Sequence, residues 1–151
     1  MKKILIAIDY HPVSEQVVEA GRDLAKQIGA EICLIHVEAD AQYYAYQYPV
    51  FMGFEPMAID MAVVSDLQER SKEFLKSAAK SLNDPSVTTH MAIGDTAKAI
   101  LEYSKEWNAD IVVMGTHSHS VIEKMMGTVA SSVLEKTEIP VFMIPIKNDN
   151  E

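Results

Sequence analysis

The stretch Ile4-Leu5-Ile6-Ala7-Ile8-Asp9, near the start of the chain, decides the fold. An unbroken apolar run that ends at a carboxylate is typical of a strand buried on both faces of a parallel sheet. The next segment opens at Pro12 or Ser14 and carries apolar residues at helical spacing. It ends at Gly29, a residue type that is common just past a helix end. A buried strand followed by an amphipathic helix is the repeating unit of α/β folds.

The rest of the chain repeats this unit. Because strands alternate with helices, we expect an α/β protein whose parallel sheet has helices on both faces. Right-handed crossovers limit the order of the five strands to a few choices. Of these we expect a single doubly wound sheet with the order 3-2-1-4-5. We assign residues 1–147 to one domain and 148–151 to a tail. Further strands are predicted at Ile32–Val37, Val87–Ile93, Asp110–Met114 and Pro140–Ile146, and further helices at Met61–Leu82, after the capping turn Gly94-Asp95-Thr96, and from Thr128.

The charge and composition of the chain restrict its partners. The 151 residues carry a net charge of −9, and 48% of them are hydrophobic. An acidic surface repels phosphate backbones, so we expect no nucleic acid partner. The first apolar run is too short for a signal peptide, and no run approaches the ~20 apolar residues of a membrane span. We therefore expect a cytoplasmic protein that does not bind membranes, in which the single cysteine, Cys33, forms no internal disulfide.

Candidate ligand-binding residues follow the predicted strands. In open parallel sheets, ligands bind beyond the carboxyl ends of the strands, where the strand order reverses. Asp9 follows the first strand, and Gly115 follows the fourth, where a glycine lets the backbone approach a ligand closely. Gly127 and Thr128 stand at a predicted helix start, where free amides and the helix dipole favour an anion. From spacing alone, Gly115 could equally end a strand and Thr128 could equally cap a helix.

Five segments form a joint pattern: Ile4–Asp9, Gly94-Asp95, Asp110–His117, Gly127-Thr128-Val129 and Ile139-Pro140-Val141. The pattern resembles the universal stress protein family over nearly the whole chain. ATP-binding members of that family carry a Gly, two residues, a Gly, nine residues, a Gly, and then Ser or Thr. Here Gly115, Gly127 and Thr128 match this pattern. Ser118 stands at the second Gly, and the segment from there to Gly127 is shorter by one residue.

The resemblance implies that the protein binds ATP, with or without Mg²⁺, or another adenine nucleotide. It places Asp9 near the ribose or a nucleotide-bound metal, although this carboxylate could instead cap the helix that follows. The resemblance also implies that main-chain amides and hydroxyls contact the phosphates. The residues expected to contact the nucleotide are Ala7, Ile8, Asp9, Val37, Met114, Gly115, His117, Ser118, Gly127, Thr128 and Val129.

The sequence contains no recognisable catalytic motif. It has no Gly-x-x-x-x-Gly-Lys-Ser/Thr loop, nucleophile elbow or His-Glu-x-x-His pattern. We therefore expect a stress-response regulator that is not an enzyme, with at most weak ATP hydrolysis. His117 and His119 form a His-x-His pair without a strong third ligand nearby in sequence, so we expect no resident metal. Ser118 and the shortened loop also motivate an alternative, a nucleotide-independent interaction module on the same fold.

Two segments are candidate interaction surfaces. The last predicted strand is strongly apolar, and an uncovered apolar edge strand favours aggregation. Universal stress proteins often dimerise through this strand, so the resemblance implies a homodimer, and we also expect a protein partner of unknown identity. The aromatic segment Tyr43–Phe54 fits a lid or a partner contact as well as it fits a loop packed on its own body. The residues expected at the dimer interface are Val141, Phe142, Met143 and Ile144.

Overall fold

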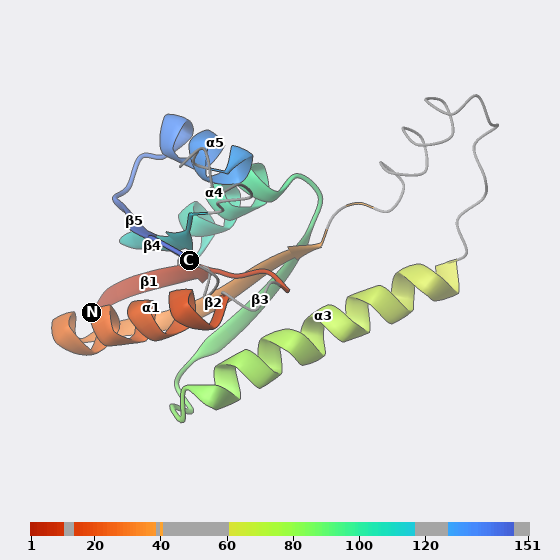
Figure 1. Cartoon of the computed structure of the whole chain (residues 1–151), viewed down its shortest axis with the longest axis horizontal. Coiled ribbons are helices and arrows are strands. Elements are labelled where there is room, and N and C mark those ends of the chain that lie inside the picture. Colours follow the sequence, from red (N-terminus) through yellow and green to blue (C-terminus); the bar gives the residue numbers. More distant parts are fainter. Residues whose placement is uncertain (11–13, 39, 41–60, 117–126, 147–151) are drawn as a thin grey trace.

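A computed structural model of the chain describes residues 1–10, 14–38, 40, 61–116 and 127–146. Strands and helices alternate along the described chain, as expected for an α/β fold (Figure 1). The aromatic segment Tyr43–Phe54 and the predicted tail at 148–151 lie outside the described residues. The elements are β1 (Lys2–Ala7), α1 (Ser14–Ile28), β2 (Ala30–Glu38), α3 (Met61–Ser81), β3 (Thr88–Ile93), α4 (Thr96–Glu106), β4 (Ile111–Gly115), α5 (Thr128–Lys136) and β5 (Val141–Ile144).

The five strands form one parallel sheet in the order β3-β2-β1-β4-β5, which confirms the predicted topology. From β1 the chain first builds outward to β2 and β3, and then returns to the other side of β1 to build β4 and β5. The strand order therefore reverses between β1 and β4. In doubly wound sheets, a ligand crevice is expected at the carboxyl edge of this switch point.

Two layers of helices cover the sheet. Helices α1 and α3 pack on one face, and α4 and α5 pack on the other (Figure 1). The alternation along β1 shows why both faces are dry: Ile4 and Ile6 point to the α1 and α3 side, whereas Leu5 points to the α4 and α5 side, and all three are fully buried. None of the helices in the described part of the chain is both long and apolar enough to cross a membrane.

Glycine and capping residues set several element ends. A β-carbon on Gly21 would lie 2.4 Å from Cδ1 of Ile6, so the lack of a side chain lets α1 lie close to β1. Gly29 ends α1 with a φ of +66°, a left-handed conformation that favours glycine. Asp95 caps α4, since its side chain accepts a hydrogen bond from the amide of Lys98 at 2.8 Å. These ends agree with the sequence-based expectations for Gly29 and Asp95.

The last strand is shorter than the predicted Pro140–Ile146, because β5 covers only Val141–Ile144. Proline has no N–H to give to the ladder, so Pro140 and Pro145 limit the strand at both ends. Carbonyl oxygens at both ends still accept bonds from β4 and the residue after it: Val112 N donates to Pro140 O and Thr116 N donates to Ile144 O, both at 3.0 Å. Among the described residues, β5 pairs with β4 alone, which makes it the edge strand that the predicted strand order implies.

Candidate ligand pocket

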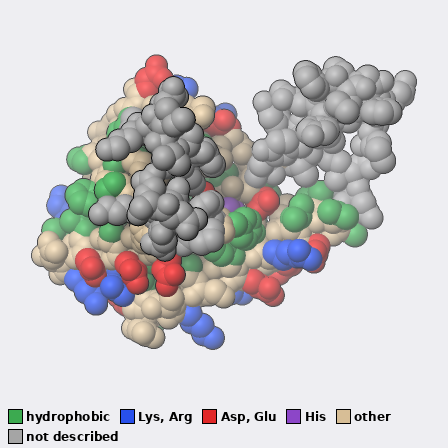
Figure 2. All heavy atoms as spheres, viewed as in Figure 1, with side chains coloured by type: hydrophobic (Ala, Val, Ile, Leu, Met, Phe, Trp, Pro, Cys, Tyr) green, Lys and Arg blue, Asp and Glu red, His purple; other side chains and the backbone are tan. Residues whose placement is uncertain are grey.

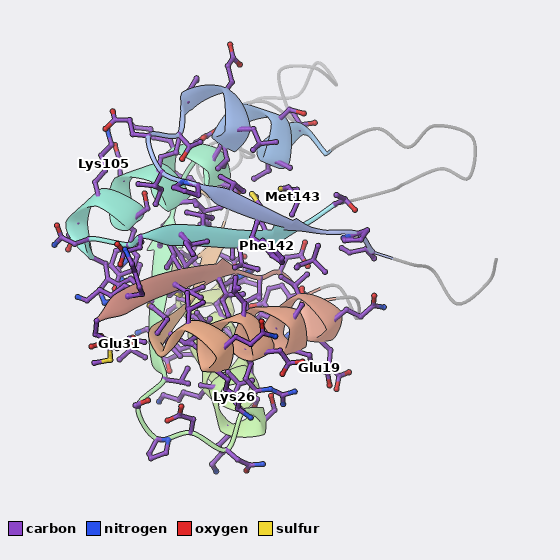
Figure 3. All side chains as sticks on the ribbon, turned by 90° about the vertical axis from the view of Figure 1, so that its left-hand side faces the viewer. Glu19, Lys26, Glu31, Lys105, Phe142 and Met143 are labelled. Carbon is purple, nitrogen blue, oxygen red and sulfur yellow. The ribbon has the colours of Figure 1, made fainter. Side chains whose placement is uncertain are left out.

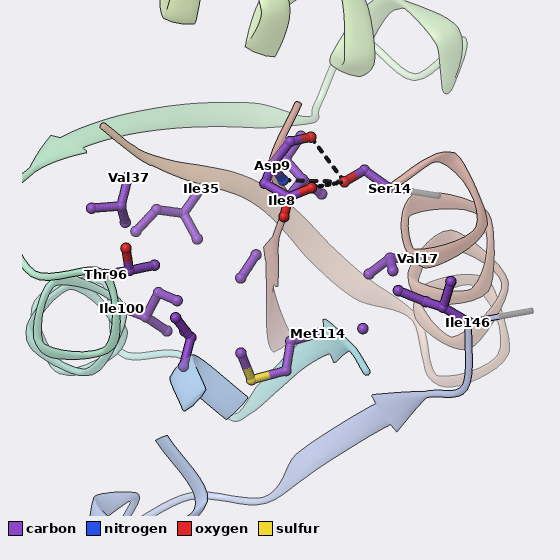
Figure 4. Close-up of a pocket in the computed structure, with 13 residues that line it drawn as sticks. Ile8, Asp9, Ser14, Val17, Ile35, Val37, Thr96, Ile100, Met114 and Ile146 are labelled. Atoms are coloured by element: carbon purple, nitrogen blue, oxygen red, sulfur yellow. Dashed lines mark hydrogen bonds between the residues drawn. The ribbon is translucent and has the colours of Figure 1, made fainter. Parts of the chain in front are cut away.

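A pocket opens at the carboxyl edge of the sheet, at the switch point between β1 and β4 (Figure 4). It encloses about 550 Å³ of space, including the part that is open to solvent. Its walls come from the ends of strands on one side and from α1, α4 and α5 on the other. The lining residues are Ala7, Ile8, Asp9, Ser14, Val17, Ile35, Val37, Thr96, Ile100, Met114, Gly115, Val129 and Ile146.

Most of the residues predicted from sequence meet in this pocket. Gly127 and Thr128 are described but do not line it; they form the start of α5, next to the lining residue Val129. His117 and Ser118 lie outside the described residues, so their predicted contacts stay predictions. The predicted residues that line the pocket are Ala7, Ile8, Asp9, Val37, Met114, Gly115 and Val129.

The two ends of the pocket differ in chemistry. One end lies between Val37 and the first turns of α4, which contribute Thr96 and Ile100 (Figure 4). The other end carries the Asp9 carboxylate and the Ser14 hydroxyl (Figure 4). A largely apolar lining with a few polar groups is the usual make-up of a small-molecule site. The arrangement suits a flat, partly apolar ligand with a hydroxyl-rich part toward Asp9.

A hydrogen-bonded turn fixes Asp9 against α1. The amide of Asp9 donates to the Ser14 hydroxyl at 3.1 Å. The same hydroxyl lies 2.8 Å from the carbonyl oxygen of Asp9 and 2.9 Å from its Oδ1, and it donates its one hydrogen to either of them. Ser14 is the first residue of α1, so Asp9 is bonded to the start of this helix and also lines the pocket, while the capping of the helix by its carboxylate stays a prediction.

Gly115 serves the pocket through packing. A β-carbon at this position would lie 2.5 Å from Cδ1 of Ile146 and 2.8 Å from Cγ2 of Val17, closer than real β-carbons approach other atoms. Gly115 ends β4, and because it has no side chain, Val17 and Ile146 can close one side of the pocket. Of the two sequence-based alternatives for Gly115, the strand end is confirmed, and the close approach of its backbone to a ligand stays a prediction.

The start of α5 lies beside the pocket. Gly127 is the N-cap residue, with an extended backbone, and Thr128 is the first residue of the helix. Thr128 is therefore not the cap residue, and the sequence-based alternative that it caps the helix is wrong. Gly127 has no side chain with which to cap this helix start, and amides in the first turn of a helix lack main-chain partners. Such amides are suited to bind an anion.

Six lining residues were not among the predicted site residues. Ile35 precedes Val37 on the same strand face, and Ile146 follows β5, so the rule that ligands lie beyond strand ends could have found both. Thr96 and Ile100 come from a helix, and their place in the pocket depends on how α4 packs on the sheet. Ser14 and Val17 likewise depend on the packing of α1.

The described residues contain no group of three or more His, Cys, Asp or Glu side chains that could hold a metal ion. His117 and His119 lie outside them, so the expectation of no resident metal stays a prediction. At the pocket, Asp9 contributes the carboxylate that could reach a metal carried by a ligand.

The fold and the pocket define a single-sheet, doubly wound α/β protein with a ligand crevice at its switch point. The family model of the universal stress protein family matches residues 1–145. The chain belongs to the universal stress protein family.

Known proteins of this family are similar over their full lengths. Universal stress protein A homolog 2 of Coxiella burnetii is 29% identical over 147 residues, covering 97% of this chain and 96% of that protein. A solved universal stress protein from Archaeoglobus fulgidus in complex with dAMP shares the fold with a TM-score of 0.60 at 20% identity, over 97% of this chain and 98% of that one. A universal stress protein in complex with cAMP aligns with a TM-score of 0.61 at 17% identity, over 95% of both chains.

Proposed function

We propose that this protein binds ATP or another adenine nucleotide in the pocket between β1 and β4, and acts in the cytoplasm as a stress-response regulator without strong catalysis. The observation that carries the proposal is the apolar pocket at the switch point, which brings together residues from three separate predicted motifs. Two structural neighbours are complexes with adenine nucleotides, cAMP and dAMP, and this supports the choice of ligand.

Each part of a nucleotide has a matching surface in the proposal. The base fits the apolar end, between Val37 and Ile100, and the ribose hydroxyls donate to the Asp9 carboxylate. The phosphates extend toward Gly127 and Thr128 at the start of α5. Main-chain amides bind phosphates through their N–H dipoles, without Lys or Arg side chains. They can therefore hold phosphates even on a chain whose net charge is −9.

The lining of the pocket supports binding without efficient hydrolysis. Among the described lining residues, none is Lys or Arg. Rapid phosphoryl transfer needs positive charge placed at the transferred group, from Lys, Arg or Mg²⁺. A nucleotide-bound Mg²⁺ would supply part of this charge when present. In this proposal, the bound nucleotide is a signal that a protein partner reads.

Calorimetric titration of the purified chain with ATP, AMP and cAMP, each with and without Mg²⁺, tests the function. We expect saturable binding of at least one of the three. Ala7→Leu places a larger side chain in the pocket and should weaken binding at least about tenfold. Ala30→Leu is the matched control, since Ala30 starts β2 at the opposite edge of the sheet and should leave affinity unchanged.

The alternative, an interaction module that needs no nucleotide, makes the opposite prediction. If none of the three nucleotides produces heat or a shift in melting temperature at millimolar concentration, nucleotide binding is rejected and the alternative gains. Equal loss of affinity in the Ala7→Leu and Ala30→Leu variants would place the site elsewhere.

We also propose that two copies of the chain associate through β5. Two features of this edge strand support the proposal. Its outer edge has no strand partner in the part of the chain that the structure describes, and the Phe142 side chain, labelled in Figure 3, is 47% exposed. Val141 and Met143 are half-buried against the chain's own core. Ile144 is buried in that core, so its share of the interface would be main-chain pairing.

A further inference from the structure

A second group of polar and aromatic side chains lies near the pocket, on the sheet face covered by α3. His36 and Glu38 come from the end of β2, Ser71 and Phe74 come from α3, and Tyr10 comes from the segment after β1. His36 is only 5% exposed, and Ser71 is fully buried. Burying such groups is costly unless they are hydrogen-bonded, so each of their partners matters.

His36 bonds directly to the wall of the pocket. Its Nδ1 lies 2.9 Å from the carbonyl oxygen of Ile8, a residue that lines the pocket. Because a carbonyl oxygen only accepts, Nδ1 carries the hydrogen in this contact. Ile8 lies one residue past β1, and its amide donates to Ile35 O at 2.9 Å. The imidazole thus holds the main chain at the point where regular strand pairing of β1 ends.

The orientation of the His36 ring is fixed from the other side. Its Nε2 lies 3.4 Å from Oε2 of Glu38, and the Ser71 hydroxyl donates to the same oxygen. Since that hydroxyl hydrogen is used, Tyr10 donates its own to Ser71 Oγ, at 2.6 Å. The rings of Tyr10 and Phe74 pack edge-on against the imidazole, with centroids 4.7 and 5.5 Å from it.

These contacts connect α3 to the pocket. Ser71 holds Glu38, Glu38 faces His36, and His36 holds Ile8. Ile8 is followed by Asp9, whose own main chain is held by Ser14. The pocket wall formed by Ile8 and Asp9 is therefore held by two side chains: Ser14 of α1 bonds to Asp9, and His36 of β2 bonds to Ile8.

We propose that His36 is a positioning residue for the ligand pocket: its Nδ1–H sets the main-chain position of Ile8 and, through it, of Asp9. The affinity part of this inference rests on the proposed nucleotide function. The structural part does not, because it concerns the chain without ligand. His36 itself lies on the α3 side of the sheet and is not among the residues that line the pocket.

Two substitutions of His36 test the contributions of its two ring nitrogens separately. The amide nitrogen of Asn can occupy the place of Nδ1, so His36→Asn keeps a donor for Ile8. The longer Gln places its amide near the position of Nε2, so His36→Gln keeps a partner for Glu38 and loses the bond to Ile8. We expect His36→Gln to bind adenine nucleotide about tenfold more weakly than His36→Asn, as for the loss of one buried hydrogen bond.

Amide hydrogen exchange tests the same inference without ligand. We expect the amides of Ile8 and Asp9 to exchange about tenfold faster in His36→Gln than in His36→Asn. Exchange in the middle of β1, at Leu5, should be the same in both variants and provides the control. Equal exchange at Ile8 and Asp9 in both variants would overturn the proposal.

Nitrogen chemical shifts of His36 in the wild-type chain give a test that needs no variant, should either one fail to fold. A protonated Nδ1 is the expected signature, and a bare Nδ1 would overturn the proposal. If the wild type binds no nucleotide while exchange and shifts behave as expected, the proposed function fails and the positioning role stands. If nucleotide binds but with equal affinity in both variants, the positioning role fails alone.

Discussion

The Cδ1 atom of Ile146 lies 2.5 Å from the point where a β-carbon on Gly115 would stand. The glycine ends β4 and the isoleucine follows β5, so this contact joins the two strands beside the pocket. We predict that Gly115→Ala destabilises the fold by about 1–3 kcal/mol, the usual cost of overpacking, because Ile146 and Val17 must move. Urea denaturation measures this loss, and a variant as stable as the wild type would contradict the packing account.

Gly29→Ala is a useful comparison. A β-carbon at Gly29 would meet nothing within 4 Å, and the cost comes from the φ of +66° alone. We expect a loss of about 1 kcal/mol from this backbone strain. Nucleotide affinity should fall in Gly115→Ala and stay unchanged in Gly29→Ala, since only Gly115 lines the pocket.

Asp9→Asn separates the two roles of this residue. Asn keeps an Oδ1 acceptor for the Ser14 hydroxyl, which lies 2.9 Å from it in the wild type, so the melting temperature should change little. The negative charge that would accept bonds from ribose hydroxyls is lost, and we predict a roughly tenfold weaker binding of ATP. Calorimetry and a thermal melt on one preparation measure both quantities. Unchanged affinity would restrict Asp9 to the start of α1.

The sheet and the strand-end residues could be predicted from the sequence because their signals are local. Apolar runs predict strands, and parallel strands place Asp9, Val37 and Gly115 at one edge. The helix contributions could not be predicted, since Thr96 reaches the pocket only through the packing of α4. The bond between Tyr10 and Ser71 joins residues 61 positions apart, and no spacing in the sequence indicates it.

His90 should make stability depend on pH. Its ring stacks on Tyr103 with centroids 3.6 Å apart, and burial lowers its pKa below the ordinary value of 6.5, while Glu106 raises it in part. The folded chain therefore binds this proton less tightly than the unfolded chain does. The stabilising contribution is fully present above pH 6.5 and is lost as the pH falls through the lowered pKa.

The variant His90→Phe keeps a flat ring against Tyr103 and removes the titration. We predict that its stability, measured by urea denaturation, falls less than that of the wild type between pH 7 and pH 5. Parallel pH curves for the two proteins would show that His90 contributes nothing to acid sensitivity.

Phe142→Asp tests association through β5. Phe142 is an exposed large hydrophobic residue on the edge strand, as Figure 3 shows, and a charge there opposes edge pairing. By sedimentation, we expect the wild type at twice the chain mass of 16.8 kDa and the variant at that mass. Ile28→Asp is the control, because Ile28 is 41% exposed at the far end of α1. A wild type that sediments as a monomer would rule out the dimer.

The surface over α1 and α3 carries charges of both signs. On the face in Figure 2, acidic and basic side chains lie next to one another over α1 and α3. Exposed ion pairs such as Arg70 with Asp66, at 3.1 Å, and Lys72 with Glu69, at 3.4 Å, contribute little to stability. Removing either should change the free energy of unfolding by less than about 1 kcal/mol.

Methyl NMR of the chain during titration with ATP and Mg²⁺ tests the central claim most directly, because it reports which side chains meet the ligand. We predict saturable shifts at Val37, Ile100, Met114 and Val129, which line the pocket, and none at Val87, which directly precedes β3 and does not line it. Shifts confined to other methyls, or no shift at millimolar ATP, would contradict the account.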